Sequence, residues 1–459
     1  MNFIHKSAIE VVLLSIALSS CDSILDKEPL LSTTESTIFS DSSKVEANLL
    51  GIYSKVKGQL AYRGRAYQDV RGDDVVDLTQ NVSECYTVYE MAVSLTSEDN
   101  SDTWSQLYTA INEANTFISN LEKVKSVVGN KYNRYVSEAK FLRALSYYNL
   151  NVLYSYPYKT DPNALSVPLR LKPENTTGDN DLARSTVSEI FAQILDDLSD
   201  ENISYLPEGG NTYEGITRAS KGAAHILRQR IYMEEENWEK AVAEGEAVTG
   251  YELESSVAKV FNNSINKESI FSFPMADTNK GTTQTAQAYY YCTGNIFILD
   301  DSYGYLSKPN YSLSSDTRIK DLVVKKSDKY LLNKYPDSKN YLDWVPQFRY
   351  AEVLLNLAES HANLGHTDKA RQYLKQVRHR SIAAESDPLN IDNLSGNALL
   401  QAIYYERRAE FVGEGLRSID IHRRAQDYVK RNGTFTISSN GYVWPIPTSE
   451  RSANSLITD

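Results

Sequence analysis

Several patterns that mark large protein classes are missing from this chain. It contains no HExxH motif, no nucleophile elbow and no paired spacing of cysteine and histidine, so the sequence offers no familiar metal site or activated nucleophile. Basic residues form no cluster, and 48 lysines and arginines against 60 acidic residues give a formal charge of −12. Because binding to a phosphate backbone needs basic residues on one face, we exclude nucleic-acid binding. No apolar run after residue 20 is long enough to cross a bilayer.

Tryptophan is scarce, with four residues, whereas tyrosine is abundant, with 32. A tyrosine side chain combines a flat apolar ring with a polar tip, which suits it to wet surfaces. We therefore expect some tyrosines to be exposed. The length of 459 residues would hold about three average domains, although stacked repeats would share a single core.

Residues 348–380 carry the pattern around which the chain is organised. Apolar residues recur there at three- and four-residue steps, which places them on one face of a helix: Tyr350, Val353, Leu354, Leu357, His361 and Leu364. Gly365 ends this helix, and a second apolar face follows at Ala370, Tyr373, Leu374 and Val377. The pattern predicts two antiparallel helices joined by a tight turn.

A second helix pair is predicted at residues 218–250. Its apolar positions are Ala223, Ile226, Leu227 and Ile231 on one helix and Trp238, Ala241, Val242 and Val248 on the other. Residues 237–241 align with 366–370, the turn of a tetratricopeptide repeat. Gln229 and Glu236 stand where that repeat has small residues, so the repeats are degenerate. The alternative is two unrelated helical hairpins.

The N-terminus has the features of a bacterial lipoprotein. Lys6 precedes an apolar run at residues 11–18 that is too short to span a bilayer, and small residues follow it. The sequence Leu-Ser-Ser-Cys, ending at Cys21, resembles a lipobox, whose cysteine receives lipid and becomes the mature N-terminus. The alternative is an ordinary secretory peptide with an incidental cysteine. Residues 22–37 are polar, which indicates a tether between the anchor and the folded part of the protein.

The N-terminal half is predicted to contain two further antiparallel helix pairs. Two residue pairs have the spacing of a capping box at a helix start: Ser43 with Glu46, and Thr186 with Glu189. A strong amphipathic helix is predicted at 104–121, and residues 132–154 are apolar on nearly every side, which indicates a buried helix. Residues 58–102 lack the helical periodicity of apolar residues and are predicted to form loops and short irregular elements.

We predict a mainly α fold with helix pairs and a large irregular region. Residues 251–345 have almost no helical period, apart from a possible strand at 270–273, and long loops in compact folds are usually functional. The predicted segments are a signal peptide (1–20), an acylated cysteine with a tether (21–43), an N-terminal helical repeat region (44–250) with the loop insertion 58–102, an irregular ligand-side segment (251–345), a C-terminal helical repeat with a charged helix (346–425) and an extended segment (426–459).

Charged residues are unusually dense between Glu406 and Arg423. Arginine and glutamate alternate there at three- and four-residue steps, which favours pairs within the helix and contacts to neighbouring helices. We therefore expect this cluster to be structural and not catalytic.

The order and spacing of several short motifs resemble those of the SusD/RagB family, surface lipoproteins of Bacteroidetes that capture nutrients for a TonB-dependent outer-membrane transporter. The segments that carry the resemblance are Trp104 to Tyr108 with Ala114 and Asn115, 139–144, 218–222, 349–352, Glu406 to Asp420, and 444–447 with Glu450 and Asn454. The resemblance covers most of the chain. It implies four tetratricopeptide-like helix pairs with an irregular remainder, a lipid-anchored position on the outer membrane facing outwards, and a transporter of SusC type as partner. We predict no cofactor and no metal site, and the sequence leaves open whether an ion stiffens the loops.

The resemblance does not fix the ligand, because relatives capture many glycans and some capture peptides. We expect the site where segments 62–100 and 284–345 meet, since a sugar ring stacks on a flat aromatic and its hydroxyls need polar partners. The aromatic candidates are Tyr86, Tyr89, Tyr289, Tyr290, Tyr291 and Trp344, and the polar candidates are Arg71, Asp73, Asp74 and Asn295. For each aromatic, the alternative is a half-buried role in loop packing.

Two other functions stay open at this point. A glycoside hydrolase with two carboxylates could use Asp73, Asp74 and Asp77, although carboxylates so close in sequence are more often solvated or capping groups. A helical-repeat scaffold could bind a peptide, although a lipidated Cys21 places it in the wrong compartment. Cys85 and Cys292 fall in the two irregular segments, so they either form a bridge or stay buried as free thiols.

Overall fold

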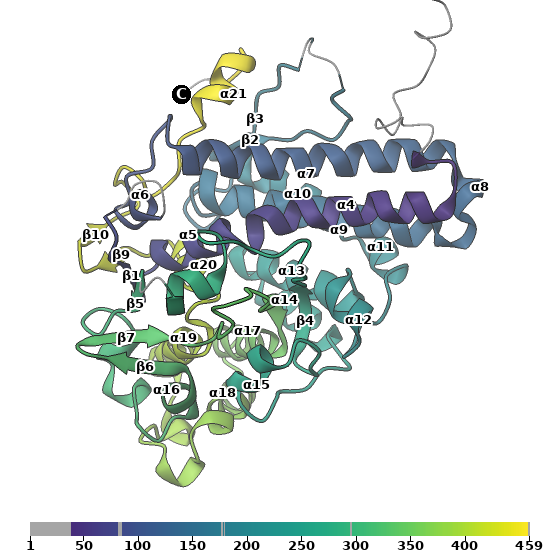
Figure 1. The fold of residues 1–459 in the computed structure, drawn as a ribbon. Coiled ribbons are helices and arrows are strands. Elements are labelled where there is room, and N and C mark those ends of the chain that lie inside the picture. The colour runs from purple at the N-terminus through teal and green to yellow at the C-terminus, as the bar shows by residue number, and fades with distance from the viewer. Residues whose placement is uncertain (1–37, 81–84, 176–177, 179, 294–295, 458–459) are drawn as a thin grey trace, which may run out of the picture.

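A computed structural model describes residues 38–457 except 81–84, 176–177, 179 and 294–295 (Figure 1). The Cys21 and tether predictions lie outside this part of the chain. The helices of the first half are α4 (Ser42–Leu60), α5 (Arg63–Arg71), α6 (Tyr86–Tyr89), α7 (Glu98–Lys123), α8 (Lys125–Val128), α9 (Tyr132–Tyr154), α10 (Val187–Asp197), α11 (Asp200–Ser204), α12 (Tyr213–Thr217), α13 (Lys221–Glu234) and α14 (Trp238–Ala247). Those of the second half are α15 (Val257–Asn262), α16 (Thr317–Leu322), α17 (Tyr350–Asn363), α18 (Thr367–Ser381), α19 (Gly396–Phe411), α20 (Leu416–Arg423) and α21 (Thr448–Ala453).

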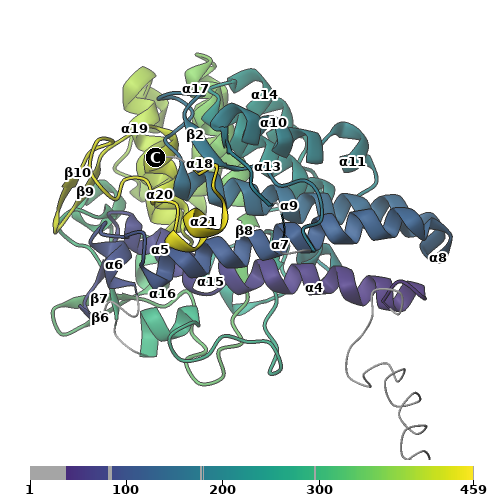
Figure 2. The same ribbon diagram turned by 90° about the horizontal axis from the view of Figure 1, so that it is seen from above.

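The long helices α4, α7 and α9 lie side by side in both ribbon views (Figures 1 and 2). Helix α9 is buried on nearly every side, as its sequence predicts, and α10 packs against it. The capping box at the start of α10 is present, with Thr186 and Glu189 each bonding the other's backbone. The predicted capping box at Ser43 is wrong, because α4 begins one residue earlier and Asp41 accepts hydrogen bonds from the backbone of Ser43 and Lys44.

The two predicted repeat pairs are α13 with α14 and α17 with α18, and they stack because α14 packs against α17. Gly365 ends the turn after α17 with a φ of +76°, a conformation that favours glycine. Gln229, which replaces a small residue of the repeat, is buried between the pairs. Its amide donates to the carbonyl of Ala241 at 3.1 Å and accepts from Asn356 at 2.9 Å. The polar group of this larger residue is therefore satisfied inside the helix stack.

Within the described ranges, the strands form five two-stranded antiparallel sheets. They pair β1 (Val75–Asp77) with β5 (Phe297–Leu299), β2 (Leu165–Pro168) with β3 (Arg184–Thr186), β4 (Ser269–Phe273) with β8 (Val345–Arg349), β6 (Val323–Lys326) with β7 (Lys329–Leu332), and β9 (Tyr428–Lys430) with β10 (Gly433–Phe435). Strand β4 confirms the strand predicted near residue 270. Strand β8 takes two residues that the pattern assigns to the following helix.

Three segments predicted to lack helices contain them, among them the irregular segment 251–345 with α15 and α16. The predicted loop insertion 58–102 includes the nine-residue helix α5, and the predicted extended segment 426–459 includes α21. Helix α5 was missed because its buried face is polar: Gln68 pairs with Ser418, and the Asp69 carboxylate accepts from the backbone of Gly415. Among the described residues, none of the helices combines the length and apolar character needed to cross a membrane.

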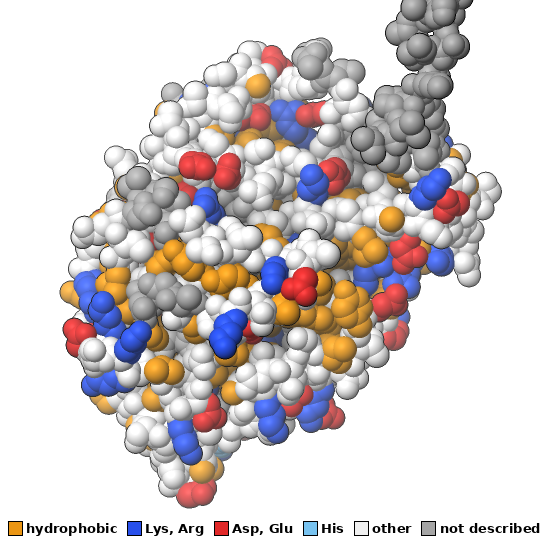
Figure 3. Space-filling model, viewed as in Figure 1, with side chains coloured by type: hydrophobic (Ala, Val, Ile, Leu, Met, Phe, Trp, Pro, Cys, Tyr) orange, Lys and Arg blue, Asp and Glu red, His pale blue; other side chains and the backbone are white. Residues whose placement is uncertain are grey.

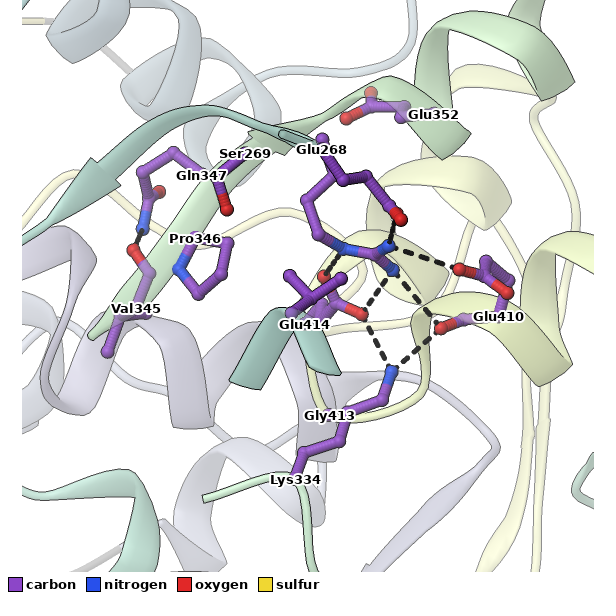
Figure 4. A network of polar contacts seen from close by, with 12 residues as sticks. Glu268, Ser269, Lys334, Val345, Pro346, Gln347, Glu352, Glu410, Gly413 and Glu414 are labelled. Atoms are coloured by element: carbon purple, nitrogen blue, oxygen red, sulfur yellow. Dashed lines mark hydrogen bonds and ion pairs between the residues drawn. The ribbon is translucent and has the colours of Figure 1, made fainter. Parts of the chain in front are cut away.

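Charged side chains fill much of the interior of the second half. Glu410 and Glu414, both fully buried, are bound by Arg349, and Lys334 bonds Glu414 at 2.7 Å (Figure 4). Figure 4 shows Glu410 on α19, Glu414 in the loop after it and Lys334 from the segment before β8 converging on one network. The prediction that the charged run is structural is confirmed in its contacts. Most of its ion pairs join different elements, and the Arg423–Asp420 pair lies within α20.

Candidate functional site

The two irregular segments do meet, as predicted. Strand β1 pairs with β5 in the register Val76 to Ile298, and the Gln287 amide donates to the carbonyl of Tyr62 at 2.8 Å. Figure 1 shows the two strands side by side at the edge of the molecule. The junction therefore joins residues that are far apart in the sequence, 225 positions for Tyr62 and Gln287.

Three of the predicted polar site residues are buried. Arg71 has no exposed surface, and its guanidinium donates to the backbone carbonyls of Val152 and Tyr442. Asp73 bonds Arg417 at 2.6 Å, and Asp74 bonds Arg408 at 2.8 Å. Such side chains cannot reach a ligand in this conformation, so we correct their expected role from ligand contact to support of the loops.

The acidity of Asp73 reflects these pairs. Burial raises the pKa of its carboxyl, but the guanidinium groups of Arg417 and Arg408 outweigh that effect and lower the pKa to about 2. Asp77 is also buried, and its carboxylate accepts from the backbone and hydroxyl of Thr79 at 2.8 and 2.7 Å. The three carboxylates considered for hydrolysis are therefore held in the interior by other groups, with no cleft leading to them among the described cavities.

The predicted aromatic residues divide into an inner and an outer set. Tyr290 and Tyr291 are fully buried, and the Tyr290 ring stacks on Phe297 with centroids 4.9 Å apart. Tyr89 is 5% exposed, and the Lys430 amine lies 4.3 Å from its ring centroid. We therefore assign these three rings to packing, which is the alternative that the sequence left open.

The outer set consists of Tyr86, Tyr289 and Trp344, which are partly exposed. Asn295, the remaining predicted residue, lies outside the described residues. Sequence reasoning missed Tyr213, whose side chain is 56% exposed and whose ring meets the edge of Trp344 at a centroid distance of 5.6 Å. The signal was present, because Tyr213 directly follows the turn sequence Gly-Gly-Asn-Thr at 209–212.

Polar groups border these rings. Asp343, next to Trp344, accepts a hydrogen bond from the backbone of Asp337 at 2.8 Å, and burial raises the pKa of its carboxyl to about 6. Near the β1–β5 junction, the hydroxyl of the partly exposed Tyr62 donates to the carbonyl of Asn279 at 2.7 Å. Figure 3 shows hydrophobic side chains gathered across the middle of the face drawn there, with charged residues around them. We use the name aromatic face for the exposed or partly exposed rings Tyr62, Tyr86, Tyr213, Tyr289 and Trp344, of which Tyr213 and Trp344 are in ring contact.

The aromatic face can bind flat apolar surfaces, and its neighbours can exchange hydrogen bonds with hydroxyl or amide groups. Among the described residues, no group of three or more histidine, cysteine, aspartate or glutamate side chains could hold a metal ion. Cys85 and Cys292 are free thiols, so the bridge considered from the sequence is wrong. The Cys292 sulfur instead contacts backbone carbonyls, including that of Tyr335 at 3.3 Å.

Comparison with known proteins identifies the family. Two family models cover most of the chain: "SusD family" at residues 273–459 and "Starch-binding associating with outer membrane" at residues 24–233. A SusD-like protein of Formosa agariphila is 25% identical over 531 aligned positions, covering 99% of this chain and 98% of the relative.

Solved structures agree with these matches. A SusD superfamily protein from Bacteroides fragilis is 47% identical and aligns with a TM-score of 0.89, covering 92% of this chain and 100% of that chain. A structure described as a laminarin-binding SusD-like protein aligns with a TM-score of 0.72 at 20% identity, covering 91% of this chain and 98% of that chain, a likeness of fold alone. By these matches over nearly its whole length, and by its helix pairs and irregular face, the chain belongs to the SusD/RagB family.

Proposed function

We propose that this protein is a surface lipoprotein that binds an oligosaccharide on its aromatic face and delivers it to a TonB-dependent outer-membrane transporter of SusC type. The observation that carries the proposal is the exposed pair of Tyr213 and Trp344, with a carboxyl group beside it. A sugar ring has an apolar C–H face that stacks on such rings and hydroxyls that bond to carboxyl and amide groups. A family whose model is described as starch-binding makes a glycan the first choice.

The protein acts by binding alone in this proposal. The carboxylates that a hydrolase would use are committed to arginine and threonine partners, so they are not paired across an open cleft as glycoside hydrolysis requires. A few stacking contacts of about 1 kcal/mol each, set against the cost of association, suggest an affinity between roughly micromolar and millimolar. Weak binding suits a protein that must release its ligand to a transporter.

The anchor and the partner follow from the N-terminus and the family. Cys21 carries the lipid, and the polar residues 22–37 could span up to about 50 Å when extended, enough for the protein to move over a transporter while it stays anchored. The family model that matches residues 24–233 is described as associating with the outer membrane. We place the protein on the outer face of that membrane.

The proposal is tested by incubating protein that lacks residues 1–21 with a panel of glycans and peptides. We expect retention of at least one glycan without shortening, and loss of that retention in Tyr213→Ala and Trp344→Ala variants. Shortened products would identify an enzyme, and retention of peptides alone would make this a peptide-binding member of the family.

The partner is tested by mild detergent extraction and affinity purification from the native membrane. We expect a large outer-membrane protein in about equal amount. Recovery of the protein alone, together with unchanged nutrient uptake when the gene of a neighbouring barrel-type transporter is deleted, would favour a free-standing adhesin instead.

A further inference from the structure

A small cleft lies away from the aromatic face, where the ends of several helices meet. Its walls include Trp238 at the start of α14, Tyr404 on α19, and Arg424, the residue that follows α20, and its volume is about 160 Å³. Figure 2 places α14, α17 and α19 on the side opposite α15, α16 and the β6–β7 hairpin. None of the residues that line the cleft belongs to the aromatic face, so the cleft is separate from the proposed oligosaccharide site.

Arg424 differs from the arginine beside it in how it is bonded. Arg423 forms ion pairs with Glu359 at 2.6 Å and with Asp420 at 2.9 Å. Arg424 makes no ion pair with any described carboxylate; its guanidinium stacks over the ring of Tyr404 at 4.0 Å, and its Nε donates to Gln426 at 3.3 Å. Its Nη1 atom is buried and has no hydrogen-bond acceptor among the described residues.

The other charges of the cleft are already balanced. Lys159 forms an ion pair with Glu236 at 2.5 Å, and Arg423 forms an ion pair with Glu359. Burial lowers the pKa of Arg424 to about 10, because the attraction of Asp420 does not compensate for lost hydration and Arg423 repels it. Arg424 is still charged at neutral pH, and its buried Nη1 donor has no acceptor among the described residues. A buried charged N–H group without an acceptor costs free energy, which a bound anion would recover.

We propose that this cleft binds the oxyanion group of a small acidic molecule, a carboxylate or a sulfate, with Arg424 as the group that recognises it. A guanidinium offers parallel N–H donors that match two oxygens of such a group, and charge-assisted bonds of this kind are about twice as strong as neutral ones. The small volume of the cleft suits one charged group or one small ring. Trp238 supplies an apolar wall for a ring.

The test is a titration of the whole protein with sodium sulfate and with D-glucuronate at constant ionic strength, followed by thermal unfolding and calorimetry. Sulfate stabilises many proteins through general exclusion, so the readout is the difference between variants. We expect saturable binding of at least one oxyanion to the unaltered protein, at least tenfold weaker binding to Arg424→Gln, and an intermediate effect in Arg424→Lys. Arg371→Gln, which removes a partly exposed arginine elsewhere that is paired with Asp368, should bind as the unaltered protein does.

The two probes also separate the possible sources of the anion. Stronger binding of glucuronate assigns the site to sugar acids, and stronger binding of sulfate assigns it to sulfate groups. Arg424→Gln should unfold at the same temperature as the unaltered protein or higher when no oxyanion is added, because the buried Nη1 donor that lacks an acceptor is lost. The proposal is overturned if neither probe shows saturable binding, or if Arg424→Gln and Arg371→Gln respond alike. This site is independent of the proposed oligosaccharide function, which its failure would leave untouched.

Discussion

Arg349 holds Glu414 with two hydrogen bonds of 2.7 Å, one from Nε to Oε2 and one from Nη2 to Oε1. Arg349 is the last residue of β8, and Glu414 follows α19, so the pair ties two distant parts of the chain together. Trp344 directly precedes β8. The buried ion pair therefore fixes the strand that leads to the aromatic face.

Replacing Arg349 with Met should lower the free energy of unfolding by about 3 to 5 kcal/mol, because Glu414 and Glu410 would lose a buried partner. Urea unfolding followed by circular dichroism measures the change. The control is Lys369→Ala, which removes an exposed ion pair with Glu246 and should change stability by less than about 0.5 kcal/mol. Equal effects of the two substitutions would show that the buried network does not stabilise the fold.

Asp74→Asn should affect folding more than ligand binding. The Asp74 carboxylate accepts from Arg408 at 2.8 Å and from the backbone of Tyr305 at 2.7 Å, and loss of its charge leaves Arg408 with Asp73 alone at 3.2 Å. We expect a loss of about 1.5 to 3 kcal/mol of stability, the range for hydrogen bonds to charged groups. Affinity for a bound glycan, measured well below the unfolding temperature, should stay within about twofold. A large loss of affinity with unchanged stability would return Asp74 to the ligand site.

The sequence predicts an element correctly when the residues that reveal it lie close together in the chain. The repeat helices and the buried helix α9 were predictable because their apolar residues recur within a few positions of one another. Helix α5 was not, because its buried side chains are polar and find their partners more than 200 residues away. Arg65, for example, donates to the carbonyl of Pro346 at 2.9 Å. No short window of sequence contains both members of such a pair.

The candidate site shows the same limit at the level of single side chains. The meeting of the two aromatic-rich segments that lack a helical period was predicted, and the pairing of β1 with β5 confirms it. The sequence could not decide which of three consecutive tyrosines faces solvent: Tyr289 is partly exposed, whereas Tyr290 and Tyr291 are buried against aromatic neighbours. Tyr213 was missed because it lies in a region assigned to helical repeats.

Stability should fall as the pH rises through neutrality, in part because of Glu234. Burial raises the pKa of this carboxyl to about 7, compared with 4.5 in an unfolded chain. The folded protein therefore holds a proton that the unfolded chain has already released, so the contribution is complete below pH 4.5 and lost as the pH passes 7. The difference in pKa corresponds to roughly 3 kcal/mol.

Glu234→Gln should remove this dependence. Between pH 4 and pH 8 the variant should lose roughly 3 kcal/mol less stability than the unaltered protein, because the amide does not titrate. The exposed Glu239 provides the control, and Glu239→Gln should follow the unaltered protein at every pH. Parallel curves for Glu234→Gln and the unaltered protein would contradict the raised pKa.

Cys21→Ala should release the protein from the membrane fraction. A lipid chain contributes about 0.8 kcal/mol for each buried methylene group, and two or more chains anchor a protein stably. Fractionation of cells followed by labelling with a palmitate analogue measures both the position and the modification. Cys85→Ala, which alters a buried free thiol, should remain in the membrane fraction. A Cys21→Ala protein that still sediments with membranes and takes the label would exclude Cys21 as the anchor.

Loss of Tyr213 should weaken glycan binding without weakening the fold. Its side chain is 56% exposed, so Tyr213→Ala removes little packing, but it removes one ring of the pair with Trp344. An aromatic contact of about 1 kcal/mol corresponds to a fivefold loss of affinity, which calorimetry with the best glycan of the panel can measure. Tyr205→Ala is the matched control, because that tyrosine is also exposed, at 38%, but lies on the loop after α11.

The double variant decides whether the two rings form one binding platform. Residues in contact are not expected to act independently, so Tyr213→Ala combined with Trp344→Ala should lose less affinity than the sum of the two single losses. Strictly additive losses would mean that the rings bind separate parts of the ligand. Single and double variants that all bind as Tyr205→Ala does would move the site away from this pair, to the part of the aromatic face around Tyr86 and Tyr289.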